Sequence, residues 1–250
     1  MHSGNRHRIH SPYLYRLVCE VIRNGRASGE LKAVEEIRKE CRRSHEVIMK
    51  TDYGDGNNHS GNNSYPVKIR RLALTSLTSP AHARRLFRMV RFIKAERILE
   101  IGTSLGITTA YLALANPGAR IITLEGCPQL CLKAREHFSR LGIRNVEVIE
   151  GRFEVTLSQA LDRLGHADLI YVDGNHRKEA MLDYYQKCLA YSFNNSVMIF
   201  DDIHAHMGME EAWEQIRQQE EVRISLDLFF SGWIFFRKES SKQHFRLRYF

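Results

Sequence analysis

The chain lacks any apolar run that could cross a membrane. A spanning helix needs about 18 or more consecutive apolar residues, and no stretch of this sequence approaches that length. Residues 1–10, MHSGNRHRIH, are polar where a secretory leader would carry its apolar core. Large-scale disorder is also disfavoured, because 43% of the 250 residues are hydrophobic. We expect a cytoplasmic globular protein that does not contact a membrane.

Cysteine is scarce and has no metal-binding or disulfide pattern. The chain has five cysteines, an odd number, and none of them forms a C-x-x-C pair. This set indicates neither a disulfide framework nor a zinc knuckle. Cys127 and Cys131 lie one helical turn apart, and we expect them to pack in the interior. A G-x-S-x-G motif is also missing, so no nucleophilic serine is indicated.

Acidic residues are in the minority, with 29 Asp and Glu against 37 Lys and Arg, a net charge of +8. A basic surface is one signature of nucleic-acid binding. Here the excess is spread over the N-terminal segments, residues 84–97 and the tail 237–250, without the interleaved aromatic residues of a nucleic-acid groove. We interpret it as a solvated basic surface and do not expect nucleic acid as a partner.

Residues 1–73 predict an N-terminal helical cap with a flexible loop. Apolar residues recur at helical spacing after Ser11 and Pro12, which suit an N-cap and a first helical position. Residues 29–50 predict a second amphipathic helix. The segment 51-TDYGDGNNHSGNNSY-65 is rich in Gly, Asn, Ser and Asp and predicts a loop. We expect the loop and the cap helices to close over a substrate.

Residues 74–250 predict a doubly wound α/β domain that forms one compact unit with the cap. A helix that begins near Ser79 and Pro80 leads into the first strand. Strands are predicted at residues 97–101, 120–125, 146–150, 168–172, 197–201, 222–229 and 232–236. Intervening and following helices are predicted at residues 106–115, 128–141, 154–164, 177–191 and 207–219. This alternation predicts a Rossmann-like, seven-stranded, mostly parallel sheet with an antiparallel last strand. The terminal strands could supply the edge of a homodimer.

The stretch 98-ILEIGTSLG-106 joins the first strand to a helix, an arrangement that binds nucleotide-like ligands through free backbone N–H groups. The dinucleotide fingerprint is G-x-G-x-x-G, whereas Gly102 and Gly106 give G-x-x-x-G with Glu100 just before them. A carboxylate would repel a pyrophosphate but attract an ammonium and a sulfonium. Glu125 ends the next strand, where such folds place an acid against ribose hydroxyls. The motif therefore favours S-adenosylmethionine over NAD.

Over residues 74–236 the chain resembles class I S-adenosylmethionine-dependent methyltransferases. Within that class it is similar to the catechol O-methyltransferase-like enzymes, especially a small bacterial branch with a D-G-x-H motif. The motifs that carry the resemblance are 98-ILEIGTSLG-106, 122-ITLEG-126, 170-IYVDGNH-176 and 199-IFDDIHAHMGMEEAW-213. One departure is Ser104, which stands where the broad class commonly has a glycine.

The resemblance implies cofactor contacts at the ends of four strands. It implies that the methionine part of the cofactor contacts Glu100, Gly102, Thr103, Ser104 and Gly106, and that the ribose contacts Glu125 and Gly126. Gly151, Arg152 and Phe153 would border the adenine, and Asp173 would also contact the cofactor.

The fourth and fifth predicted strands end in carboxylates. Carboxyl ends of neighbouring parallel strands meet at one edge, so Asp173, Asp201 and Asp202 should converge beside the cofactor. Their mutual repulsion would be offset by a hard divalent cation, which the resemblance also implies. We predict Mg²⁺ or Mn²⁺ here, lowering the pKa of the acceptor hydroxyl. The alternative is that Asp173 lines the cofactor pocket while Asp201 or Asp202 caps a helix or pairs with a basic residue.

His176 is the predicted general base. It lies three residues after Asp173, where the resemblance implies a catalytic lysine or histidine. An imidazole with a pKa near 6.5 is mostly neutral at pH 7 and can accept a proton. Asp173 is the second predicted catalytic residue, and His204 and His206 are weaker candidates for the base or for acceptor contacts.

The expected function is therefore S-adenosylmethionine-dependent methylation of a hydroxyl on a small molecule. A nucleic-acid methyltransferase that uses the basic surface is a competing hypothesis. However, no cysteine ends the fourth or fifth strand, as cytosine C5 methylation would need, and no N-P-P-Y-type motif replaces 173-DGNH-176. Two further hypotheses are a non-catalytic cofactor-binding protein of the same fold and an NAD-dependent enzyme.

Overall fold

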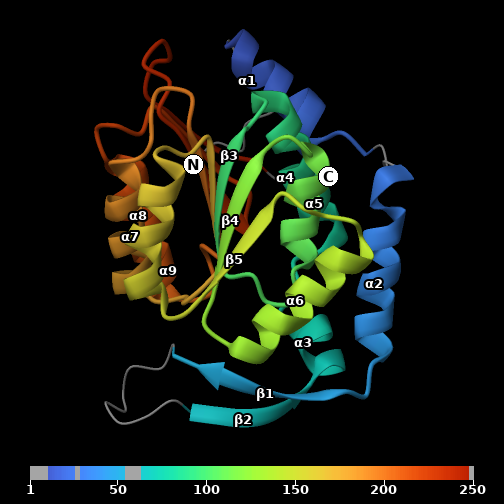
Figure 1. The fold of residues 1–250 in the computed structure, drawn as a ribbon. Coiled ribbons are helices and arrows are strands. Elements are labelled where there is room, and N and C mark those ends of the chain that lie inside the picture. Colours follow the sequence, from blue (N-terminus) through green and yellow to red (C-terminus); the bar gives the residue numbers. More distant parts are fainter. Residues whose placement is uncertain (1–10, 26–28, 54–62, 248–250) are drawn as a thin grey trace.

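A computed structural model describes residues 11–25, 29–53 and 63–247 of the chain. Its centre is an eight-stranded sheet with the strand order β10-β8-β9-β7-β6-β3-β4-β5 (Figure 1). The strands are β3 (Arg97–Ile101), β4 (Arg120–Glu125), β5 (Val146–Glu150), β6 (Leu169–Val172), β7 (Val197–Asp201), β8 (Ile224–Asp227), β9 (Ser231–Phe235) and β10 (Gln243–Arg246). β9 is antiparallel to both its neighbours, β7 and β8, and the other pairs are parallel.

The predicted doubly wound, mostly parallel sheet is confirmed, with one strand more than predicted. Residues 224–227 and 231–235 form β8 and β9, and the antiparallel member is β9, as expected. The addition is β10, which pairs in parallel with β8 at the sheet edge. Its sequence, QHFR, is short and polar, and its burial alternates only weakly. No local hydrophobic pattern therefore distinguishes it from a basic tail.

Helices cover both faces of the sheet. One face packs against α7 (Phe153–Leu164), α8 (Lys178–Leu189) and α9 (Met207–Gln218), and the other packs against α4 (Pro80–Ile93), α5 (Ile107–Ala115) and α6 (Pro128–Arg140) (Figure 1). Each face has its own hydrophobic cluster. Cys127 and Cys131 are fully buried, as expected. No helix in the described ranges has the length and apolar character needed to span a membrane.

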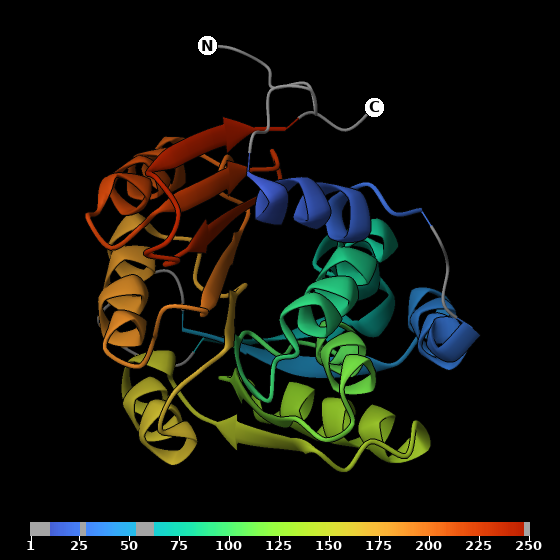
Figure 2. The same cartoon turned by 90° about the horizontal axis from the view of Figure 1, so that it is seen from above.

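The N-terminal residues pack on the α4–α5 face. They form α1 (Pro12–Leu17), η2 (Val18–Ile22), η3 (Gly29–Leu31), α2 (Lys32–Arg43) and α3 (Ile69–Thr75). Figure 2 shows α1 and η2 in blue beside α4. Leu14 and Val34 share one hydrophobic cluster with Ile98 of β3. The predicted helix starts are correct, because Ser11 and Ser79 each accept a backbone hydrogen bond ahead of a proline.

The prediction of one helix over residues 29–50 is wrong. The helix ends at Arg43, and β1 (Val47–Asp52) pairs with β2 (Asn63–Lys68) as an antiparallel hairpin. Ile48 is buried between exposed Val47 and Met49, which is the two-residue alternation of a strand. The predicted loop at 51–65 is thus strand at both ends. Its middle, residues 54–62, lies outside the described residues.

Candidate active site

A cavity of about 720 Å³ opens where β3, β4, β6 and β7 end. Parallel α/β sheets bind ligands at this edge, where the strand order reverses. Most of the predicted site residues line the cavity: Gly102, Ser104, Glu125, Gly126, Arg152, Phe153, Asp173, His176, Asp201 and Asp202. Six others are not among its lining residues: Glu100, Thr103, Gly106, Gly151, His204 and His206. The topology therefore brings the two predicted groups, cofactor residues and acidic residues, to one cavity.

The turn after β3 has a backbone that only glycine adopts easily. Gly102 has φ +104°, and a Cβ there would lie 2.2 Å from the carbonyl oxygen of Asp173. Ser104 also has a positive φ, 48°. A positive φ costs a non-glycine residue about 1 kcal/mol. This cost and the close approach of Asp173 explain why glycine suits position 102. Asn175 and Asp202, which also line the cavity, have φ values of 54° and 53°. Backbone strain of this kind gathers at functional sites.

Glu125 occupies the cavity edge at the end of β4. Its two carboxylate oxygens accept hydrogen bonds from the backbone N–H groups of Ser104 (2.7 Å) and Cys127 (2.9 Å). Each oxygen can accept a further bond. Burial raises the pKa of Glu125, and these backbone donors lower it in part. The carboxylate is thus held rigidly, with capacity left for ribose hydroxyls.

Glu100 is completely buried behind the turn. One carboxylate oxygen accepts hydrogen bonds from the hydroxyls of Thr109 and Thr123, whereas Oε1 has no hydrogen-bond partner among the described residues. Burial raises the pKa of Glu100 to about 7, against the lowering effect of the two hydroxyls. An unpaired buried carboxylate oxygen is costly. Because Glu100 does not line the cavity, its predicted contact with the cofactor stays a prediction.

Replacing Glu100 by glutamine is expected to stabilise the free protein above pH 7. Below pH 4.5 the carboxyl is protonated in both folded and unfolded chains, so it brings no penalty. Between 4.5 and about 7 the unfolded chain ionises first, and the free energy of unfolding falls as the pH rises. At pH 8 we expect Glu100→Gln to gain about 3 kcal/mol over the wild type, measured by urea denaturation. Equal effects at pH 4 and pH 8 would contradict this, and Glu96→Gln on the surface is the control.

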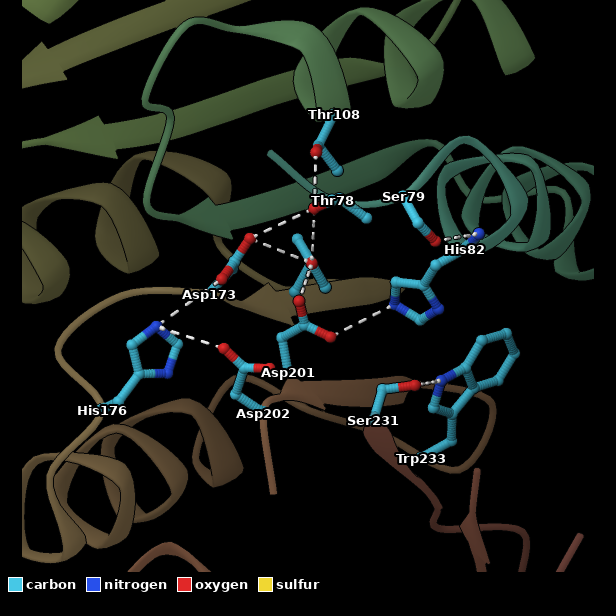
Figure 3. Close-up of polar contacts among 11 residues, drawn as sticks. Thr78, Ser79, His82, Thr108, Asp173, His176, Asp201, Asp202, Ser231 and Trp233 are labelled. Atoms are coloured by element: carbon cyan, nitrogen blue, oxygen red, sulfur yellow. Dashed lines mark hydrogen bonds and ion pairs between the residues drawn. The ribbon is translucent and has the colours of Figure 1, made fainter. Parts of the chain in front are cut away.

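Three aspartates gather on the other side of the cavity (Figure 3). The Tyr171 hydroxyl lies between two of them, 3.1 Å from Asp173 Oδ2 and 3.0 Å from Asp201 Oδ2. Burial raises the pKa of Asp173 well above its ordinary value, and the charge of Asp201 raises it further. Burial and the charge of Asp202 raise the pKa of Asp201 to about 7. The histidines that lie near Asp173 and Asp201 are His176 and His82, and burial lowers the pKa of both, which favours their uncharged forms.

The aspartates fit a divalent cation in chemistry, because such ions prefer carboxylate oxygens. Their arrangement is not that of a metal site. In the described part of the chain, no group of three or more His, Cys, Asp and Glu side chains is placed to hold a metal ion. The Tyr171 hydroxyl separates Asp173 from Asp201. Binding would require these side chains to close around the ion.

The three candidate histidines differ in how they are engaged. His176 is half-buried, with Nε2 3.9 Å from Asp173 Oδ1 and 4.0 Å from Asp202 Oδ2. Burial lowers its pKa, which favours the neutral imidazole at pH 7. Both ring nitrogens of His204 are taken, by Glu210 (3.0 Å) and Asp227 (3.1 Å). His176 therefore remains the best placed of the three candidates for a base.

Both ring nitrogens of His206 form hydrogen bonds to the backbone. Its Nδ1 accepts from the N–H of Gly208 at the start of α9, and its Nε2 donates to the His176 carbonyl oxygen at 2.8 Å. It thus caps a helix and holds the backbone of the neighbouring candidate base.

Sequence reasoning missed three residues of the acidic half. Tyr171 lies on β6 two positions before Asp173, which directly follows the strand, and the Tyr171 hydroxyl lies 3.1 Å from Asp173 Oδ2. The two-residue period of a strand could have indicated that both side chains point the same way. Thr78 Oγ1 lies 3.4 Å from Asp173 Oδ2 and accepts from the Thr108 hydroxyl. His82 lies on the far side of Asp201 from Asp173, with Nε2 3.4 Å from Asp201 Oδ1 (Figure 3). Burial lowers its pKa to about 3, so it is uncharged. No sequence motif marks Thr78 or His82.

Comparison with known proteins agrees with this geometry. Residues 99–203 match the family model described as a methyltransferase domain. The chain is 34% identical over 117 residues to a catechol O-methyltransferase of Mycobacterium tuberculosis, covering 44% of this chain and 50% of that protein. It is 27% identical over 133 residues to a protein-L-isoaspartate O-methyltransferase of Ignicoccus hospitalis, covering 53% and 60%. The match thus spans about half the length of these relatives.

A solved structure extends the likeness over nearly the whole fold. The SAH-bound methyltransferase PaMTH1 of Podospora anserina superposes with a TM-score of 0.66 at 19% identity, covering 94% of this chain and 99% of that one. At this identity the likeness shows the fold. The resemblance inferred from the sequence motifs is confirmed: the chain has the fold of class I methyltransferases, and over about half of its length its sequence is similar to catechol O-methyltransferases.

Proposed function

We propose that the protein is an S-adenosylmethionine-dependent O-methyltransferase that methylates a hydroxyl of a small molecule. The observation that carries this proposal is that one cavity joins the Ser104 and Glu125 end to Asp173 and His176. A cofactor bound by the first pair would present its methyl group toward the second pair. Methyl transfer needs alignment and desolvation more than covalent chemistry from the protein, and no cysteine is among the described residues that line this cavity.

Each half of the cavity has a separate role in this proposal. Glu125 accepts the ribose hydroxyls, and the strained turn at Gly102 allows the methionine part to approach the backbone. His176 takes the proton from the acceptor hydroxyl, because it is the candidate histidine whose imidazole has no structural hydrogen bond within the described residues. Asp173, in the same half as His176, orients the reacting groups.

Metal assistance is a further part of the proposal. Asp173, Asp201 and Asp202 would hold Mg²⁺ or Mn²⁺, supported by the oxygen chemistry of the set and by the raised pKa values of Asp173 and Asp201. A bound divalent cation would lower the pKa of the acceptor hydroxyl. The cytoplasmic location and the homodimer stay predictions.

Calorimetric titration tests the cofactor first. We expect micromolar binding of S-adenosylmethionine, no binding of NAD, and a heat of Mn²⁺ binding that Asp201→Asn removes. Failure to bind S-adenosylmethionine with or without Mg²⁺ would refute the proposed activity. Cofactor binding that is unchanged by metal, together with no Mn²⁺ heat, would remove only the metal from the proposal.

An acceptor screen separates the competing activities. Phenols and catechols test the proposed acceptor class, an isoaspartyl peptide tests the activity named for the Ignicoccus hospitalis relative, and RNA tests the use of the basic surface. RNA binding that weakens steeply with salt would favour a nucleic-acid methyltransferase. Tight cofactor binding without turnover on any acceptor would favour a non-catalytic protein.

A further inference from the structure

The β1–β2 hairpin is hydrogen-bonded to the segment that follows β4, at the Glu125 end of the cavity. The backbone N–H of Met49 donates to Gln129 Oε1 at 2.7 Å, and the N–H of Thr51 donates to the sulfur of Cys127 at 3.4 Å. The Cys127 thiol in turn donates to the Met49 carbonyl oxygen. These contacts join the hairpin to the residues directly after β4. Thr51, at the start of the predicted 51–65 loop, therefore lies beside Cys127, two residues after Glu125.

Tyr53 follows β1 and lines the cavity there. A Cβ placed on Gly126 would lie 2.8 Å from Cδ2 and 2.9 Å from Cε2 of the tyrosine, so the ring rests directly against the glycine backbone. The guanidinium carbon of Arg152 lies 5.8 Å from the ring centroid, within cation–π range. The aromatic ring is thus held between the end of β4 and the end of β5.

This position matches the chemistry of a nucleoside. Glu125, the proposed acceptor of ribose hydrogen bonds, directly precedes Gly126. A sugar held by Glu125 would place its base near Gly126 and Arg152, where Tyr53 lines the cavity. An aromatic ring at such a position gives a nucleobase a stacking surface. We propose that Tyr53, supplied by the N-terminal hairpin, is a further cofactor-binding residue that covers the adenosine part of the ligand. This inference rests on the proposed function.

The test measures binding of S-adenosylhomocysteine and of adenosine by calorimetry. Tyr53→Ala is expected to weaken both ligands about tenfold, because both carry the adenosine. Tyr53→Phe keeps the ring and is expected to bind within about threefold of the wild type. Tyr65→Ala is the matched control, since Tyr65 lies on β2 of the same hairpin, is exposed and does not line the cavity.

A second substitution tests the ring contact itself. Gly126→Ala would displace the tyrosine ring, so it should weaken binding in the wild type and add little in the Tyr53→Ala background. Unchanged binding by Tyr53→Ala, or an equal loss in Tyr65→Ala, would overturn the inference and leave the proposed function standing. If the wild type binds neither ligand, both proposals fall.

Discussion

Replacing His176 by alanine is expected to lower the rate of methyl transfer at least about a hundredfold while the affinity for S-adenosylmethionine stays within a few-fold. A general base that takes a proton in the transition state contributes about 10²–10⁴ in rate. The His176 imidazole is half-buried, lies within 4.0 Å of two carboxylates and has its pKa lowered by burial. Single-turnover kinetics with a saturating acceptor measure this step separately from binding.

His204→Ala is the matched control for the base. His204 is engaged by Glu210 and Asp227, so its loss should lower stability and leave the single-turnover rate of the folded protein close to wild type. A rate for His176→Ala equal to that of the wild type would show that another group takes the proton. An equal loss of rate in both variants would point to a general effect on the loops after β6 and β7.

Replacing Gly102 by alanine is expected to lower the free energy of unfolding by about 3 kcal/mol or more and to abolish cofactor binding. The new Cβ would lie 2.2 Å from the carbonyl oxygen and 2.8 Å from the carbonyl carbon of Asp173. These atoms belong to the backbone just after β6. The Asp173 N–H donates a hydrogen bond to the Ile101 carbonyl oxygen at 2.8 Å. Neither side can move without separating β3 from β6, and the φ of +104° adds its own strain.

Gly142→Ala is the control that separates the cost of a positive φ from the cost of the steric clash with Asp173. Gly142 also has a positive φ, 67°, but a Cβ there would meet nothing within 4 Å. It should therefore cost only the left-handed conformation, about 1 kcal/mol. Urea denaturation of both variants measures the difference. A loss in Gly102→Ala no larger than in Gly142→Ala would mean that the turn after β3 can shift.

Elements with a strong local pattern could be predicted from the sequence. Ser11 with Pro12 and Ser79 with Pro80 carried their own helix-start signals, and both helices begin there. The continuous apolar runs of the parallel strands likewise matched their positions. Where the pattern was weak, prediction failed: the hairpin at Val47–Asp52 follows a helix without a break signal, and β10 has little apolar content.

The candidate site divides in the same way. Glu125, Asp173 and Asp201 could be assigned to one edge because strand ends of a parallel sheet meet there, and all three line the cavity. Thr78, His82 and Tyr53 could not, because they reach the cavity from segments outside the strand-end pattern.

The sequence by itself determined the alternation of strands and helices, the glycine turn after β3 and the acids at the strand ends, because each depends on neighbouring residues and a short repeat. Only the tertiary structure decided which histidine remains free, that Tyr171 separates two aspartates, and that Tyr53 lies against Gly126. The contacts of His204 with Asp227 and of Tyr171 with Asp201 join residues 23 and 30 positions apart. Contacts at such separations depend on how the chain packs, and no local pattern encodes them.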